Sequence, residues 1–223
     1  MDIVCLIFDG ITALDAIGPY EVLSRMPGAR FQFVAPGATT VRSDNGLVCW
    51  TAQASIDQVS RADLLLVPGG IGARRIANDE AVLSWLRAID ATTKLTATVC
   101  TGSLLVAASG LLQGRKATTH WAFHDSLREL GAIPVSERCV RDGKYASAAG
   151  VSAGIDLALT LVLELAGREM AEAIQLSIEY DPKPPLDAGS PDKVAAPLRE
   201  ALYNRMQAMQ ARAAREAAER AGR

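Results

Sequence analysis

The sequence predicts a doubly wound α/β domain with a mostly parallel sheet, on three observations. Short apolar runs of strand length alternate with segments of helical periodicity, which is typical of parallel strands joined by crossover helices. Two of these runs pass directly into a glycine-rich turn or a helix, as strands do at the carboxyl edge of such a sheet. Asp142-Gly143 between two short runs adds one hairpin. The strand-like runs are residues 3–8, 30–34, 47–50, 63–67, 95–99, 139–141 and 144–146.

The helical segments between these runs carry their own local signals. We expect Gly18-Pro19 to open the first helix, because proline suits a first-turn position where no N–H is needed. Asn78 is expected to cap a helix that continues to residue 89, and Gly131 to end one that begins near residue 122. Residues 151–166 are apolar enough for a buried helix, and another helix is expected over 168–180.

The composition changes after residue 180. Four prolines within residues 181–191 exclude regular structure there. Residues 194–223 are rich in Ala, Arg, Glu and Gln, and predict a surface helix with one narrow packing stripe. We therefore divide the chain into an α/β domain over residues 1–192 and a helical extension over 193–223, packed on its own domain or on a partner subunit. The stripe consists of Leu198, Leu202, Arg205, Met206 and Met209.

Length, charge and cysteine content exclude several classes of protein. The 223 residues suit a single domain with a substantial core. A balance of 23 Lys and Arg against 25 Asp and Glu gives a net charge of −2, so we expect no nucleic-acid partner. The four cysteines lack C-x-x-C or metal-site spacing. The start has no signal-peptide pattern and no run of 18 apolar residues occurs, so we expect a cytoplasmic protein without a membrane partner.

Cys100 is the first candidate for chemistry. An alternating apolar run stops at this cysteine, and helical spacing begins at Ser103, so Cys100 lies at a strand-to-helix elbow. The positive end of the helix dipole is expected to favour the thiolate. Gly102 is expected to make the turn tight, because glycine adopts backbone angles that other residues avoid. The alternative is a small, buried, unreactive cysteine.

Two further loops are expected at the same edge of the sheet. Asp15 follows the first strand and is either the N-cap of the first helix or a buried acid that faces the site. Pro68-Gly69-Gly70 follows another strand and lacks the pattern of a nucleotide loop, so its backbone N–H groups are better used to bind developing charge. The convergence of these loops with Cys100 predicts an active site there.

The remaining polar candidates are given structural roles. His120 and His124 are the only histidines, and for His120 a structural hydrogen bond is favoured over catalysis. Two histidines without a nearby acidic ligand set also make a zinc site improbable. Glu21 reads as a solvated acid of the first helix.

Several motifs together resemble the DJ-1/PfpI superfamily. They are the elbow from Val99 to Ser103, the turn Val67-Pro-Gly-Gly70 and the segment Leu14-Asp-x-x-Gly-Pro-x-Glu-Val-Leu23. Further segments resemble the members that hydrate isocyanides, and the likeness extends from about residue 3 to residue 192. These segments are 114–121, 150–156, 175–182 and 188–192.

The resemblance implies a flavodoxin-like fold, a homodimer, no cofactor, and hydration of an isocyanide to an N-substituted formamide. Carried over to this sequence, it implies that Cys100 is the nucleophile, Asp15 the acid and base, and Thr101 the polar neighbour, while Gly70 and Ile71 supply backbone N–H groups. Thr101 stands where the superfamily's proteases have histidine, which counts against peptidase activity. The roughly thirty residues after Pro191 are too few for a helix-turn-helix domain. A redox or small-molecule sensor, or an enzyme acting on α-keto aldehydes, stays open as an alternative.

Overall fold

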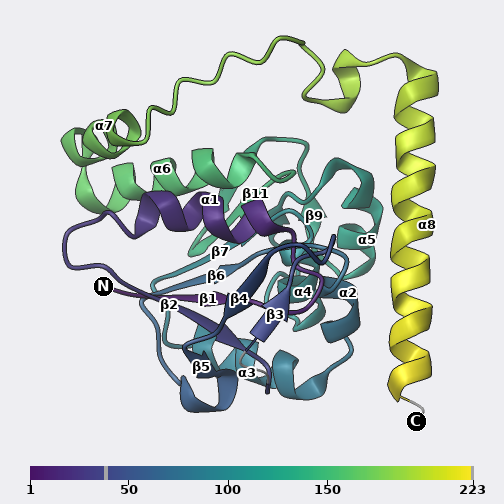
Figure 1. Cartoon of the computed structure of the whole chain (residues 1–223), viewed down its shortest axis with the longest axis horizontal. Coiled ribbons are helices and arrows are strands. Elements are labelled where there is room, and N and C mark those ends of the chain that lie inside the picture. The colour runs from purple at the N-terminus through teal and green to yellow at the C-terminus, as the bar shows by residue number, and fades with distance from the viewer. Residues whose placement is uncertain (38–39, 222–223) are drawn as a thin grey trace.

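A seven-stranded sheet forms the centre of the molecule, in the order β10-β11-β7-β6-β1-β2-β5 (Figure 1). The computed structural model describes residues 1–37 and 40–221, with side chains except at 214 and 216–221. Every pairing is parallel except that of β10 with β11. This confirms the predicted α/β fold, and β2-β1-β6-β7-β11 has the flavodoxin-like strand order. The strands are β1 (Asp2–Leu6), β2 (Arg30–Ala35), β5 (Ala54–Ser55), β6 (Leu64–Val67), β7 (Leu95–Val99), β10 (Cys139–Asp142) and β11 (Tyr145–Ala148).

Helices cover both faces of this sheet. In Figure 1, α1 and α6 run side by side above the sheet, and α3 lies below it. Close packing of α1 on α6 depends on small residues, because a Cβ at Gly18 would lie 3.0 Å from Ile155 Cγ1. The helices are α1 (Ala13–Leu23), α2 (Ala73–Ile76), α3 (Glu80–Asp90), α4 (Gly102–Ala108), α5 (His124–Glu129), α6 (Ala153–Ala166), α7 (Arg168–Ser177) and α8 (Ala196–Ala221), with 3₁₀ turns η1 (Ile56–Gln58), η2 (Trp121–Phe123) and η3 (Pro191–Lys193).

Two helix starts differ from the sequence prediction. Helix α1 begins at Ala13, five residues before the expected start at Gly18, and Pro19 lies inside it. In α3 the capping side chain belongs to Asp79, whose carboxylate accepts the Ala81 N–H at 3.0 Å, and not to Asn78. In α3 two neighbouring polar residues offer similar caps and the tertiary fold selects Asp79, whereas the N-cap residue of α1, Thr12, makes no side-chain capping bond.

Short strands outside the main sheet were only partly predicted. The run expected at residues 47–50 becomes β4 (Cys49–Thr51), which forms a hairpin with β3 (Thr40–Arg42). A second pair, β8 (Lys116–Ala117) with β9 (Ile133–Pro134), was not predicted. The β3–β4 hairpin is fastened to the end of β1, because Gly10 N–H donates to Arg42 O at 2.8 Å and Asp44 N–H to Ile11 O at 2.9 Å.

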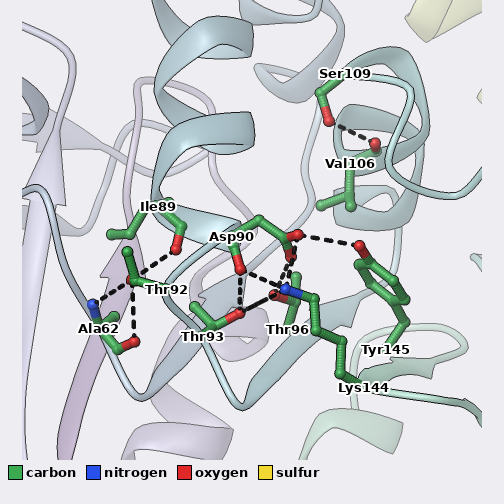
Figure 2. A network of polar contacts seen from close by, with 10 residues as sticks. All are labelled: Ala62, Ile89, Asp90, Thr92, Thr93, Thr96, Val106, Ser109, Lys144 and Tyr145. Atoms are coloured by element: carbon green, nitrogen blue, oxygen red, sulfur yellow. Dashed lines mark hydrogen bonds and ion pairs between the residues drawn. The ribbon is translucent and has the colours of Figure 1, made fainter.

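A buried polar network closes the edge of the sheet opposite the carboxyl ends of its parallel strands (Figure 2). At its centre Asp90, only 4% exposed, accepts hydrogen bonds from Thr96 at 2.6 Å and Tyr145 at 3.0 Å, and pairs with Lys144 at 2.8 Å. Burial, followed by the charge of Asp90, raises the pKa of Tyr145 to about 12. Since both carboxylate oxygens have partners, this network ties α3 to β7 and β11 without leaving a polar atom of Asp90 unpaired.

The C-terminal helix α8 lies along α2 and η2 (Figure 1, yellow). Gln210 and Ala213 are buried in this contact, and Gln207 Nε2 donates to Ala122 O at 2.6 Å. In the single chain most apolar side chains of the predicted packing stripe are exposed: 53% for Leu198, 38% for Leu202 and 46% for Met209. They do not pack on their own domain, and packing on a partner subunit stays a prediction. In the described part of the chain, no helix combines the length and apolarity needed to cross a membrane.

Candidate active site

Three loops meet beyond the carboxyl ends of β1, β6 and β7, which is where ligands bind in sheets of this topology. Their backbones are joined directly. Thr12 N–H donates to Gly69 O at 2.9 Å, and Gly72 N–H donates to Gly10 O at 2.9 Å. Gly70 has a φ of +130°, and a Cβ there would lie 2.3 Å from Gly10 O, so the contact between the two loops requires glycine.

Cys100 occupies the elbow between β7 and α4 in a left-handed conformation, with φ at 57°. This conformation is costly for a non-glycine residue and persists only when its surroundings enforce it. Here Cys100 N–H donates to Ala149 O at 2.9 Å, while Cys100 O accepts the hydroxyls of Ser103 at 3.0 Å and Thr119 at 2.9 Å. The elbow is therefore held from the strand, the helix and a separate loop.

Gly102 has a different role from the one expected. Its φ is not positive, so it is Cys100 itself that bears the unusual backbone angle. A Cβ at Gly102 would lie 2.0 Å from Val67 O, so this position needs glycine because β6 approaches α4 closely. This contact holds the start of α4 against the end of β6.

The Cys100 sulfur is buried, with 6% of the residue exposed. Two backbone N–H groups, of Thr101 and Val151, donate hydrogen bonds to it. Val151, just before α6, has a φ of 23°, which is rare for a β-branched residue. Sequence reasoning missed both Val151 and Thr119. Neither has a local signal, because each reaches Cys100 from a distant part of the chain.

Asp15 lies in the first turn of α1 and faces Cys100. It is fully buried, its Oδ2 accepts Gly69 N–H at 3.0 Å, and its side chain hydrogen-bonds with that of Cys100. Its Oδ1 has no partner among the described residues. Thr12 occupies the N-cap position, so of the two roles considered for Asp15 the cap is wrong. Burial raises the pKa of Asp15 to about 7, against the lowering effects of Gly69 and Cys100.

The pKa of the Cys100 thiol is raised well above its usual value. The largest cause is burial and the second is the negative charge of Asp15, which together outweigh the N–H groups of Thr101 and Val151. The expectation of a thiolate favoured by the helix dipole was wrong, because the short helix α4 does not offset this desolvation. The two groups instead form one hydrogen-bonded acid pair, in which a proton can pass between sulfur and carboxylate.

The other three predicted site residues lie beside this pair. The Thr101 hydroxyl accepts Gly70 N–H at 2.9 Å and lies 3.2 Å from Gly70 O. These contacts join the elbow to the turn after β6, and they occupy the Gly70 N–H that was expected to bind substrate. A Cβ at Gly69 would lie 2.5 Å from Thr101 N, which explains the glycine there. The partly exposed Ile71 has no acceptor for its N–H among the described residues, so it is the free backbone donor of this turn.

The remaining polar candidates lie around this centre. His120 is buried, and its Nδ1 accepts Ala122 N–H at 3.3 Å. Burial, followed by the charge of His124, lowers the pKa of His120 to about 4. Glu21 pairs with Arg25 at 2.6 Å on the surface, as expected of a solvated acid. Within the described residues, no group of three His, Cys, Asp or Glu side chains could hold a metal ion.

Comparison with known proteins agrees with this arrangement. A model of the DJ-1/PfpI family matches residues 1–164. The chain belongs to the DJ-1/PfpI family. This confirms the resemblance found in its motifs.

Two curated relatives belong to different functional classes. The isonitrile hydratase of Pseudomonas putida is 44% identical over 187 residues, which cover 84% of this chain and 82% of that enzyme. The HTH-type transcriptional regulator CdhR of Pseudomonas aeruginosa is 30% identical over 173 residues, but these are only 50% of the regulator. The likeness to the hydratase therefore extends over most of both proteins.

Solved structures show the same fold over 81% to 97% of the chain. A THiJ/PfpI family protein from Pseudomonas syringae superposes with a TM-score of 0.91 at 36% identity, covering 97% of this chain and 90% of that one. Oxidised DJ-1 of Toxoplasma gondii superposes with a TM-score of 0.71 at 26% identity, covering 81% of this chain and 99% of that one. The greater coverage by the first includes the region beyond residue 192.

Proposed function

We propose that this protein is an isocyanide hydratase, which converts R–N≡C and water to the formamide R–NH–CHO. The observation that carries the proposal is the buried pair of Asp15 and Cys100, in which a carboxyl group with a pKa of about 7 hydrogen-bonds to a thiol. The similarity to the isonitrile hydratase of Pseudomonas putida supports the choice of substrate. A general acid with a pKa near the working pH can both give and take a proton.

In the first step the Cys100 sulfur attacks the terminal carbon of the isocyanide. The thiol proton passes to Asp15, and Asp15 gives it to that carbon as the S–C bond forms, leaving the thioimidate R–N=CH–S–Cys100. A soft sulfur nucleophile suits this small carbon electrophile. The N–H groups of Thr101 and Val151 hold the sulfur in place while its charge changes.

In the second step ionised Asp15 draws a proton from water as the oxygen adds to the thioimidate carbon. The proton goes to nitrogen, which gives R–NH–CH(OH)–S–Cys100. The C–S bond then breaks as the hydroxyl becomes the formamide carbonyl, and the released proton restores the Cys100 thiol. Asp15 thus serves first as acid and then as base, and its net charge is unchanged over the cycle.

The same geometry weakens the alternatives. An oxidation sensor needs an exposed, low-pKa thiolate, whereas the pKa of Cys100 is raised and the residue is nearly fully buried. The match to the regulator CdhR covers 50% of that protein, whereas the match to the hydratase covers 82% of that enzyme. Activity on α-keto aldehydes is not favoured by any particular contact at the site.

We also propose that the protein acts as a cytoplasmic homodimer. Exposed apolar side chains on α6, α7 and α8 support the dimer, because a single chain leaves them in water. They are Leu163, Leu165, Leu176, Leu198, Leu202 and Met209. Light scattering at micromolar concentration should give twice the 23.6 kDa of one chain.

The test of the function is formamide formation from cyclohexyl and aryl isocyanides by the purified protein. We expect turnover by the unmodified chain and less than a few per cent of it in Cys100→Ala, a substitution that removes one small buried atom and preserves the fold. Cys139→Ala serves as the matched control, because Cys139 lies on β10 and its sulfur faces Ala153 O at 3.8 Å. Undiminished activity in Cys100→Ala, or none in the unmodified chain, would reject the proposal.

A further inference from the structure

His120 brings a polar group to the reactive sulfur that the steps above do not use. Its neighbour Thr119 donates to Cys100 O at 2.9 Å, so this segment lies against the elbow. The His120 ring faces Gly150: a Cβ on Gly150 would lie 3.1 Å from Cδ2 and 3.6 Å from Nε2. Gly150 stands between Ala149, whose carbonyl accepts Cys100 N–H, and Val151, whose N–H points at the sulfur. The ring therefore packs on Gly150, between the two residues whose backbones contact Cys100.

In the neutral His120 ring the proton is on Nε2, which lies on the side of the ring that faces Gly150. Ala122 N–H donates to Nδ1, so in the neutral ring the hydrogen is assigned to Nε2. The pKa of about 4, lowered first by burial, keeps the ring neutral at working pH. Nε2 has no hydrogen-bond partner among the described residues, and it is not among the polar atoms closed off from solvent. It is therefore a free N–H donor on the side of the ring that packs against Gly150.

The orientation of this donor is enforced by packing. The His120 ring packs at a tilt against Trp121 and Phe123, both with centroids 5.7 Å away. Helix α8 holds this segment in turn, since Tyr203 packs on Trp121 at 6.3 Å and Gln207 binds Ala122 O. A side chain locked by its neighbours presents its hydrogen bond without reorganisation. The absence of a side chain at Gly150 leaves room for it.

We propose that the His120 Nε2–H group hydrogen-bonds to the nitrogen of the thioimidate and of the adduct that water forms from it, which makes His120 a further catalytic residue. The inference rests on the proposed hydration. Isocyanide nitrogen has no free lone pair, because all its valence electrons are in bonds. When the S–C bond forms and carbon gains its proton, one N–C bonding pair becomes a lone pair on nitrogen, which can then accept from Nε2–H.

This interaction exists only after bond formation begins, so it lowers the barrier without strengthening substrate binding. It also favours the second step, because the nitrogen gains electron density as water adds to the carbon and before the proton arrives. His120 itself stays neutral throughout, since a ring with so low a pKa is a poor proton acceptor. Loss of the donor should reduce kcat, and KM should fall with it, because slower breakdown lets the thioimidate accumulate.

The test compares His120→Phe, which keeps a ring against Trp121 but has no donor, with His120→Gln, which restores an N–H. The control is Cys139→Ala, because Cys139 lies on β10 and its sulfur faces Ala153 O at 3.8 Å. We expect kcat to fall roughly 10- to 100-fold in His120→Phe. We expect partial recovery in His120→Gln and no change in Cys139→Ala. Intact mass spectrometry should show the Cys100 thioimidate accumulating in His120→Phe during turnover, with an unchanged rate of Cys100 alkylation by iodoacetamide.

The outcomes separate this inference from the proposed function. Turnover by the unmodified chain together with an unchanged kcat in His120→Phe would overturn the role of His120 alone. A fall in kcat accompanied by an equal fall in the alkylation rate would also overturn it, because the substitution would then have lowered the reactivity of the Cys100 sulfur itself. No turnover by the unmodified chain would overturn both. If His120→Phe does not fold, His120→Leu replaces it as the variant without a donor. An unchanged kcat in His120→Leu, or a kcat in His120→Gln no higher than that of His120→Leu, would then overturn the role of His120.

Discussion

Replacing Asp15 by asparagine should make the protein more stable at alkaline pH while removing its activity. Asp15 is fully buried, and its pKa rises from 3.8 to about 7, with burial as the main cause. The folded state therefore holds the proton more tightly than the unfolded chain does. Between these two pKa values the folded protein carries the extra proton, so its stability falls as pH rises through this window.

The size of the effect follows from the difference between the two pKa values. A shift from 3.8 to about 7 is about 3 pH units, and each unit corresponds to 1.36 kcal/mol, so ionised Asp15 costs about 4 kcal/mol of folding free energy above pH 7. Asparagine has no charge to bury, and its side-chain oxygen can still accept the Gly69 N–H. Relative to the Asp15→Asn variant, the unmodified protein should lose about 4 kcal/mol between pH 4 and pH 8.

Urea unfolding at pH 4, 5, 6, 7 and 8 measures this difference directly. Asp57→Asn is the control, because it removes one carboxyl group at an exposed position and leaves the buried pair intact. Curves for Asp15→Asn and the unmodified chain that run parallel would refute the reasoning, since the buried carboxyl would then ionise as easily as in the unfolded chain. A gap that widens towards acid would refute its sign.

The remaining predictions concern backbone packing next to the elbow and the network at the far edge of the sheet. Gly102→Ala should cost more than about 3 kcal/mol of stability, because its Cβ would lie 2.0 Å from Val67 O and a backbone atom cannot move aside as a side chain can. Thermal unfolding measures this loss, and a loss under about 1 kcal/mol would contradict the prediction. Asp90→Asn should cost about 2 to 3 kcal/mol, because Lys144 and the Tyr145 hydroxyl lose their charged partner (Figure 2). The activity of Asp90→Asn should stay near normal, because the network lies at the far edge of the sheet, and a large fall in kcat in the folded variant would argue against this separation.

Local pattern was enough to predict the sheet and the place of the site. The apolar runs at β1, β6 and β7 are buried throughout or nearly so, and such runs of strand length are characteristic of parallel strands covered on both faces. Their carboxyl ends must share an edge, so Asp15, Gly70 and Cys100 could be grouped before any coordinates. Both the fold and this grouping follow from short-range periodicity and a general rule of topology.

The chemical state of the site depended on contacts between distant segments. Desolvation raises the pKa of both Asp15 and Cys100, and it comes from strands and helices packed around them, whereas the sequence displays only the nearby helix start. Val151 reaches the sulfur from 51 positions along the chain, and Thr119 reaches the elbow carbonyl from 19. Likewise α8 buries Gln210 and Ala213 and leaves Leu198 in water, because its partners α2 and η2 determine which side is covered. Periodicity predicts which residues share a face of a helix or strand. The burial of an ionisable group and the element that packs against a given face depend on the tertiary structure.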